Sequence, residues 1–338
     1  MAEERRPFLC QSVIMKSSRL QLIFLAAWKP VSRLGKYRAM AERFCCARSM
    51  ARLTCSAAWR PASLTGGRRC WLAALAGSQV TVLHRGPRPL ALFDPDLVDQ
   101  LVERTRELGI DLHLETEATG IEKSSAQLIV QAMASGEKRT FQTDMVVHSA
   151  GRVPEISDLN LDAAGIEWEK RRVRVNDFLQ SVSIPAVYAA GDAAASGGLP
   201  LAPVASYEGL VVAANLLKGN HQKPNYLGIP SVVFTIPPLA AVGLSERGAR
   251  EQNLKFRVKK EMTSTWYSSR RVAETYSGYK VLVEEGTDHI LGAHILGSQA
   301  SEVINLFALA IRSRMRATDL KHMLFAYPTS GSNMARML

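Results

Sequence analysis

The chain has 338 residues, which is enough for two or three domains with a sizeable core. Hydrophobic residues make up 47% of it and charged residues 22%, which excludes a disordered or fibrous protein. No apolar run approaches the ~20 residues of a membrane-spanning helix, so we expect no membrane partner. The net charge of +11 comes entirely from residues 1–76, whereas residues 77–338 hold 28 basic and 28 acidic residues. Because this larger part is neutral, we expect no nucleic-acid partner.

Residues 1–76 form a basic segment in which we expect poor order and no functional site. All five cysteines lie here, but no CxxC pair and no nearby histidine completes a zinc site, so we expect no metal. The apolar run 20–28 is similar to the core of a signal peptide, yet Trp28-Lys29-Pro30 follows it in place of a small-residue cleavage site. We expect a cytoplasmic protein, and the Arg-rich composition leaves an organelle transit peptide as the alternative.

Residues 77–150 predict a β-α-β unit followed by further short strands. Short β-branched runs between glycines predict strands, and Asp94-Pro95 predicts the start of a helix that Gly109 ends. The expected strands are 79–83, 111–114, 120–123, 127–133, 139–142 and 144–149, and the expected helix is 95–108. The β-α-β order implies parallel strands joined by a right-handed crossover.

Residues 151–227 predict a strand that ends in a glycine turn, followed by an apolar helix. The run 187–190 indicates a buried strand that ends in Gly191 and Asp192. Doubly wound folds bind ligands at the carboxyl ends of such strands. Pro203 predicts the start of an apolar helix to Leu217, whose free backbone N–H groups point at this edge.

Residues 228–338 change to a pattern of antiparallel strands and two late helices. The expected strands are 231–235, 240–243, 256–262, 279–284 and 290–296. Ser245 and Ser298 are expected to cap helices that end near residues 252 and 314. The second helix is apolar around most of its circumference, which predicts a sheet on one side and another subunit on the other.

Several segments, in this order, resemble the family of pyridine nucleotide–disulfide oxidoreductases that includes glutathione reductase, dihydrolipoamide dehydrogenase and mercuric reductase. The segments are HSAGRVPEISDLNLDAAGI, SIPAVYAAGDAAA, LAPVASYEGLVVAANLL, PLAAVGLSE and ILGAHILGSQASEVIN. The resemblance implies an α/β protein with partial doubly wound nucleotide-binding domains followed by an α+β dimerisation domain. It implies an NAD(P)-binding part at 77–150, an FAD-binding part at 151–227, a dimerisation domain at 228–338, and a homodimer.

The resemblance also implies flavin contacts. Asp192 would bind the ribitol of FAD, and Gly191 would let the flavin chain pass; an ordinary turn or helix cap is the alternative for this aspartate. Ala202 and Pro203 would place the start of their helix at the pyrimidine side of the flavin, where the helix dipole favours negative charge.

A nicotinamide nucleotide is implied at the other domain. Gly151 resembles the glycine beside which this nucleotide lies, and a plain turn glycine is the alternative. His84, Arg85 and Arg88 follow the second strand, and no acidic residue occurs between residues 79 and 93. Because a 2′-phosphate favours arginine, we expect NADP in preference to NAD, with solvated loop charges as the alternative.

The sequence departs from the family at three places. The family's first GxGxxG and its redox CxxxxC pair are absent. The second GxGxxG is not intact, because Thr65-Gly66-Gly67-Arg68-Arg69-Cys70 has two glycines and then two arginines. Tyr327 occupies the family's His position before Pro328, and Ser332 and Asn333 fall where its acidic partner would be. A phenol with a pKa of ~10 is a poor base at neutral pH.

We therefore expect an FAD-dependent oxidoreductase that passes a hydride from NADPH to flavin and then to a small-molecule acceptor, and that does not reduce a disulfide. The alternative is a non-catalytic fragment or pseudoenzyme that retains only the dimerisation fold. The abrupt change of composition near Gly77 also suggests that residues 1 to about 75 are a frame-shifted reading of the family's N-terminal region.

Overall fold

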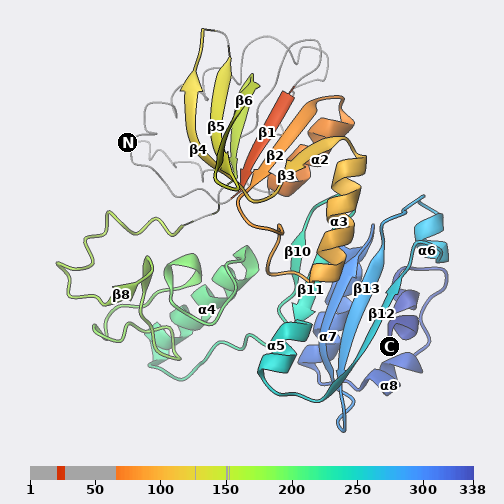
Figure 1. Cartoon of the computed structure of the whole chain (residues 1–338). Helices are drawn as coiled ribbons and strands as arrows, with labels where there is room; N and C mark the ends of the chain where they lie inside the picture. The colour runs from red at the N-terminus through yellow and green to blue at the C-terminus, as the bar shows by residue number, and fades with distance from the viewer. Residues whose placement is uncertain (1–20, 27–65, 126, 150, 152) are drawn as a thin grey trace, which may run out of the picture. The chain divides into compact units, whose positions relative to one another are not determined.

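The computed structural model describes residues 21–26, 66–125, 127–149, 151 and 153–338 (Figure 1). Its contacts divide the chain into two compact units. The first unit ends at Gly151 and also contains Val233–Pro237. The second unit consists of Arg152–Val232 and Pro238–Leu338. The first division falls one residue from the expected boundary at 150/151.

A four-stranded parallel sheet forms the centre of the first unit. In spatial order its strands are β3 (Ile110–His113), β2 (Gln79–His84), β1 (Gln21–Ala26) and β7 (Met145–Ser149). The register sets the last residue of β1, Ala26, opposite His84 on one side and Ser149 on the other. The carboxyl ends of three strands are therefore level, which is the arrangement at the ligand-binding edge of doubly wound folds.

Strand β1 corrects the expectation of poor order for the whole of residues 1–76. The run 20–28 contributes a central strand, paired in parallel with β2 and β7. Strands of a parallel sheet are covered on both faces, so they have continuous apolar sequences without alternation. Such a run is too short to be assigned from periodicity alone, and its partners lie more than 50 residues away along the chain.

Two helices accompany this sheet. Helix α2 (Gly66–Leu75) lies in the segment expected to be unstructured, and it packs against β1, β2 and β3. Helix α3 (Pro95–Glu107) confirms the prediction for its segment. The Asp94 side chain caps α3 by accepting hydrogen bonds from the backbone N–H groups of Asp96 and Leu97, at 3.1 and 3.4 Å.

A three-stranded antiparallel sheet completes the first unit. It consists of β4 (Thr116–Lys123), β5 (Leu128–Ala134) and β6 (Glu137–Thr143), with β5 in the middle. Val130 and Ala132 of β5 pack with Leu83 of β2, so the two sheets share a small apolar core. The three strands expected in this segment are confirmed.

The second unit begins with a segment that has little regular structure. It contains a two-stranded ribbon, β8 (Trp168–Glu169) with β9 (Arg172–Val173), a 3-10 turn at Gly191–Ala193, and helix α4 (Ala202–Lys218). The prediction of a buried strand at 187–190 was wrong. These residues are half-buried, and their sole bridge among the described residues joins Tyr188 to Gln180. A short apolar run becomes a strand only where a neighbouring strand pairs with it over several residues.

The rest of the second unit is a five-stranded sheet with helices. In spatial order the strands are β10 (Ser231–Val233), β11 (Leu239–Gly243), β14 (Ile290–Leu296), β13 (Gly278–Glu284) and β12 (Phe256–Met262). The helices are α5 (Glu246–Glu251), α6 (Tyr267–Arg270), α7 (Ala300–Arg312), α8 (Ala317–Lys321) and α9 (Met334–Met337), with a 3-10 turn at Gly331–Asn333. Figure 1 shows α7 lying along this sheet.

Helix α7 packs its apolar side on the sheet. Ile304 and Phe307 are fully buried, whereas Leu309 is 61% exposed. The helix begins at Ala300, and the residue before it, Gln299, provides no side-chain cap, so the expected cap at Ser298 was wrong. Ser245 caps α5 as expected, since its hydroxyl accepts a hydrogen bond from the Gly248 N–H at 3.0 Å.

Within the described residues, no helix has both the length and the apolar character that crossing a bilayer requires.

Candidate functional site

Two polar side chains end strands at the carboxyl edge of the parallel sheet. His84 closes β2 and Ser149 closes β7. Within the described part of the chain, His84 Nδ1 and Ser149 Oγ are buried and have no hydrogen-bond partner. Burial also lowers the pKa of His84, so this imidazole is neutral at pH 7. Buried polar atoms without partners suit an edge that a polar ligand covers.

The arginines that follow β2 differ in their surroundings. Arg88 Nε donates to Asp99 Oδ1 at 2.6 Å, and its Nη2 donates to Asp99 Oδ2 at 2.9 Å. Asp99 belongs to α3, beyond the 79–93 stretch that holds no acidic residue. This two-point pair occupies the guanidinium fork that would otherwise meet a phosphate. Arg85 is exposed close to His84, whose pKa its charge also lowers.

The glycines of this edge have clear backbone roles. Gly151 has a φ of +95°, and a Cβ built on it meets nothing within 4 Å. A plain turn explains the positive φ of Gly151, and the open space around its Cα is consistent with room for a ligand. Gly66 and Gly67 form the start of α2, directly before Arg68 and Arg69. A helix start after the first strand is where doubly wound folds bind a pyrophosphate.

The Gly191–Asp192 turn packs directly on helix α4. Gly191 has a φ of +63°, and its ideal Cβ would lie 2.7 Å from the Cβ of Ala205. The glycine is therefore required by the backbone and by the approach of the helix, whatever ligand is present. Asp192 is the middle residue of the 3-10 turn, and the capping position belongs to Ala190. The helix-cap alternative for this aspartate does not fit that position, whereas the alternative of an ordinary turn does.

The start of α4 is open. Ala202 begins the helix and Pro203 follows, one residue earlier than expected, and both side chains are exposed. The capping residue, Leu201, gives no side-chain hydrogen bond to the first turn. The backbone N–H groups of this turn therefore remain available to an anionic or carbonyl-bearing ligand.

A buried glutamate joins these two elements, and the sequence analysis did not identify it. Glu208 is fully buried in α4. Its Oε2 accepts from the Gly191 N–H at 2.5 Å, and its Oε1 accepts from Ser196 Oγ at 2.7 Å and from the Tyr226 hydroxyl at 2.5 Å. Burial and then the bond to Glu208 raise the pKa of Tyr226 to about 12, so this phenol is a donor at neutral pH. An acidic residue on the buried stripe of an apolar helix was the available signal.

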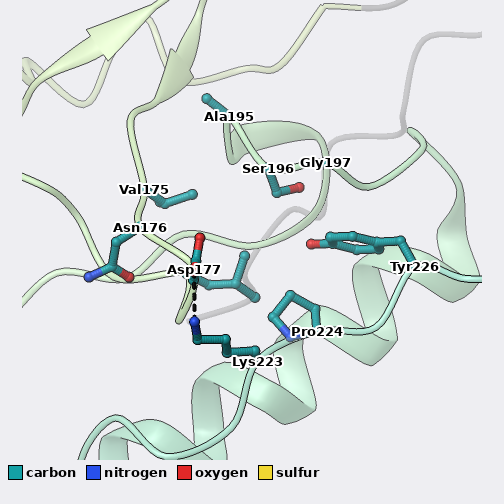
Figure 2. Close-up of a pocket in the computed structure, with 10 residues that line it drawn as sticks. Val175, Asn176, Asp177, Ala195, Ser196, Gly197, Lys223, Pro224 and Tyr226 are labelled. Atoms are coloured by element: carbon teal, nitrogen blue, oxygen red, sulfur yellow. Dashed lines mark hydrogen bonds and ion pairs between the residues drawn. The ribbon is translucent and has the colours of Figure 1, made fainter. Parts of the chain in front are cut away.

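A cavity of about 350 Å³ lies beside this network. Figure 2 shows the ion pair between Lys223 and Asp177 in its wall, with Nζ 2.7 Å from Oδ2, and the hydroxyl groups of Ser196 and Tyr226 in another part. The other residues that line it are Val175, Asn176, Leu179, Ala195, Gly197 and Pro224.

The C-terminal segment places Tyr327 on the surface. Its side chain is 79% exposed and its ring centre is 6.4 Å from that of Tyr267. Asn333 Nδ2 donates to Ser268 Oγ at 2.7 Å, and Ser332 Oγ donates to the Thr329 carbonyl at 2.6 Å, so these two residues hold the local chain. A second cavity, of about 510 Å³, is lined by α7 and by residues 328–331 together with Arg271.

The described residues show no reactive thiol and no metal cluster. Cys70 is buried, and burial raises its pKa to about 12, which makes it inert. No group of three or more histidine, cysteine or acidic side chains within the described ranges is arranged to hold a metal ion. The other four cysteines lie outside the described residues.

Two family models match the chain. The model of pyridine nucleotide-disulphide oxidoreductases matches residues 62–209, and that of the dimerisation domain of the same family matches residues 229–338. The first match begins at residue 62 and includes α2, whereas the resemblance seen in the sequence was placed from residue 77 onward. The frame-shift hypothesis conflicts with the family match over residues 62–75. The rest of the segment to which this hypothesis applies lies mostly outside the described residues.

Similar proteins include enzymes and one protein without an assigned activity. An uncharacterized 19.7 kDa protein of a mercuric resistance operon in Staphylococcus aureus is 51% identical over 180 residues, which are 53% of this chain and all of that protein. Dihydrolipoyl dehydrogenase of S. aureus is 32% identical over 75% of this chain and 54% of its own length. Mercuric reductase of Bacillus cereus is 30% identical over 76% of this chain and 41% of its own length.

Solved structures show the same fold. LpdA of Mycobacterium tuberculosis superposes with a TM-score of 0.72 and 24% identity, over 80% of this chain and 58% of its own. The HOCl-induced flavoprotein disulfide reductase RclA of Escherichia coli, as its Cu(II) complex, superposes with a TM-score of 0.70 and 25% identity, over 80% and 60%. The chain thus spans about half the length of the enzymes it matches.

Proposed function

Because the chain belongs to the pyridine nucleotide-disulphide oxidoreductase family, we propose that it is an FAD-dependent oxidoreductase that uses NADPH, acts as a homodimer and reduces a small-molecule acceptor. In this proposal residues 77–150 bind the nicotinamide nucleotide, residues 151–227 bind part of FAD, and residues 228–338 dimerise. The observation that carries the proposal is the packing of the Gly191–Asp192 turn against the open start of α4. The proposed compartment is the cytoplasm.

The flavin contacts follow from this packing. FAD, when bound, takes a hydride from the nicotinamide nucleotide and passes the electrons to the acceptor. Asp192 would accept hydrogen bonds from the ribitol hydroxyls, because a carboxylate is an acceptor-only group. Ala202 and Pro203 would present the first turn of α4 to the pyrimidine side of the ring, where the positive end of the helix dipole favours negative charge.

The nucleotide contacts rest on the edge of the parallel sheet. His84 and Ser149 offer buried polar atoms at level strand ends, and Gly151 leaves room beside them. Arg85 would meet the 2′-phosphate of NADPH, and Arg88 would assist only by releasing Asp99 in part. NADPH is therefore proposed over NADH chiefly on Arg85.

The acceptor is proposed to be something other than a disulfide. The sequence has no CxxxxC pair, and Tyr327 stands where disulfide-reducing relatives have histidine. A phenol holds its proton at neutral pH and serves as a hydrogen-bond donor, whereas a dithiol exchange needs a base. A quinone, a metal ion or another small molecule would need no such base.

The test is optical. The purified full-length chain is expected to bind added FAD with an absorbance maximum near ~450 nm, which NADPH bleaches under anaerobic conditions and an acceptor restores. NADH is expected to bleach it more slowly. A colourless protein that takes up no FAD in titration contradicts the proposal and supports a non-catalytic protein that retains the dimerisation fold.

A further inference from the structure

Glu208 connects three separate segments of the second unit through its carboxylate. The segments are the Gly191–Asp192 turn, the loop that runs from Ser196 to the start of α4, and the irregular segment after α4 that contains Tyr226. The first two segments are those proposed to contact the flavin. Glu208 belongs to α4, and none of its surface is exposed to solvent.

The loop is packed tightly on this carboxylate. A Cβ built on Gly198 would lie 2.6 Å from Glu208 Oε1 and 2.8 Å from Val204 Cγ1, so only glycine fits there. The Gly198 N–H donates to Ser196 Oγ at 3.2 Å, and Ser196 donates in turn to Glu208. The path from Ser196 to the helix start is therefore fixed by contacts that end at Glu208.

All three partners of Glu208 act as donors. A backbone N–H can only donate, and the raised pKa of Tyr226 keeps its proton in place. The carboxylate oxygens accept from all of them, whereas an amide NH₂ at the Oε1 position would have to donate to the Ser196 and Tyr226 hydroxyls, whose own protons would then lose this acceptor. The arrangement selects glutamate over its isosteric amide.

We propose that Glu208 is a positioning residue for the flavin site: it holds the Asp192 turn and the 196–201 loop in their relative geometry by accepting hydrogen bonds from Gly191, Ser196 and Tyr226. The effect on the flavin rests on the proposed function, whereas the connection of the three segments stands without it. Glu208 acts through Gly191 and Ser196, so losing it changes the placement of Asp192 and of the start of α4.

Asn215 provides a matched control on the same helix. It is also buried in α4, two turns further along the same stripe. Its Nδ2 donates to the carbonyls of Phe178 and Gln222, and its Oδ1 accepts from the N–H groups of His221 and Gln222. It therefore fixes different segments with a similar number of hydrogen bonds.

The experiment compares Glu208→Gln, Tyr226→Phe and Asn215→Ala with the wild-type chain by amide hydrogen exchange and by FAD titration. Glu208→Gln is expected to speed exchange at residues 190–198 about tenfold, to weaken FAD binding about tenfold and to change the visible circular dichroism of the bound flavin. Tyr226→Phe removes one donor and is expected to act in the same direction with about a third of the effect. Asn215→Ala is expected to speed exchange near residues 178 and 221–222 and to leave residues 190–198 and FAD affinity unchanged.

Two outcomes would overturn the proposal. One is wild-type exchange at residues 190–198 in a folded Glu208→Gln variant, and the other is an equal effect of Asn215→Ala on that turn. If Glu208→Gln does not fold, Tyr226→Phe decides by the same measurements. A wild-type chain that binds no FAD contradicts the proposed function, and exchange without flavin still decides whether Glu208 holds the turn.

Discussion

Gly191 faces Ala205 of helix α4 at a distance that leaves no room for a side chain, since an added Cβ would lie 2.7 Å from the Ala205 Cβ. The backbone of Gly191 also has a φ of +63°, which L-residues rarely adopt. Steric fit and backbone conformation thus place the Asp192 turn on the helix with no contribution from a ligand. The turn belongs to the folded protein, and the flavin would bind to a site that already exists.

Replacement of Gly191 by alanine is therefore expected to destabilise the second unit by about 1–3 kcal/mol and to weaken FAD binding. The control is Gly209→Ala in α4, where a Cβ meets nothing within 4 Å. Removing a glycine from an exposed helix position is expected to stabilise the protein by about 0.5–1 kcal/mol. Urea unfolding measures the stability of each variant, and equal stabilities would contradict this account of the turn.

Asp192→Asn is expected to weaken FAD binding about tenfold, because the amide is a poorer acceptor for the ribitol hydroxyls. The shape of the side chain is kept, so the unfolding midpoint is expected to change little. Asp177→Asn is the control, since that carboxylate is 75% exposed and pairs with Lys223. Flavin fluorescence during titration gives the affinities; the same loss in the two variants would argue against a specific role of Asp192.

Arg85→Ala is expected to raise KM for NADPH about tenfold and to leave KM for NADH unchanged, because only NADPH carries the 2′-phosphate. Arg88→Ala is expected to have a smaller effect, since the Arg88 guanidinium is bound to Asp99. Steady-state kinetics with the two nucleotides separates the cases. An equal rise in KM for NADH would mean that Arg85 attracts either nucleotide through its charge and does not recognise the 2′-phosphate.

Asp288 gives a pH-dependent prediction for the dimerisation part. Hydrogen bonds from Thr318, and then the Arg257 guanidinium, lower the pKa of Asp288 from 3.8 to about 2. The lower pKa in the folded state means that the stabilisation is present above pH ~4 and is lost as the pH falls towards 2. Asp288→Asn is expected to cost about 1 kcal/mol at pH 7, after allowance for solvent screening, and only a small part of this at pH 2, where Asp288 is about half protonated.

Urea titrations at pH 7, 4 and 2 measure this difference. Asp319→Asn serves as the control, because Asp319 pairs with Arg316 at the exposed surface and is expected to have little influence at pH 7. A cost of Asp288→Asn that stays constant between pH 7 and 2 would show that the lost bonds do not depend on the charge.

Leu309→Arg tests the proposed dimer. Leu309 lies on α7 and is 61% exposed, whereas Ile304 and Phe307 of the same helix are buried against the sheet. A charge at this position is expected to raise the dimer dissociation constant at least about tenfold if the open side of α7 meets a second subunit. Leu217→Arg on α4, at a side chain 84% exposed, is the control. Sedimentation velocity distinguishes the species, and a monomeric wild type would remove the premise.

Elements with local signals could be predicted from the amino-acid sequence. The Asp94 cap, the apolar stripe of α3 and the alternation of β4–β6 lie within short stretches, so helix and strand could be read from periodicity and capping. The order of the motifs indicated the family, and the resemblance implied that Asp192 and Ala202 contact the same flavin.

Features that join residues far apart in the sequence could be recognised only in the folded protein. Residues 21–26 became a central strand because they pair along their whole length with strands at 79–84 and 145–149, whereas residues 187–190, with a similar apolar run, form a single bridge among the described residues, between Tyr188 and Gln180. Arg88 is paired because α3 brings Asp99 to it, and Glu208 is buried because three segments supply donors. The hydrophobic pattern of a segment indicates which secondary structure that segment prefers. Its hydrogen bonds and its burial depend also on the segments that pack against it in the fold.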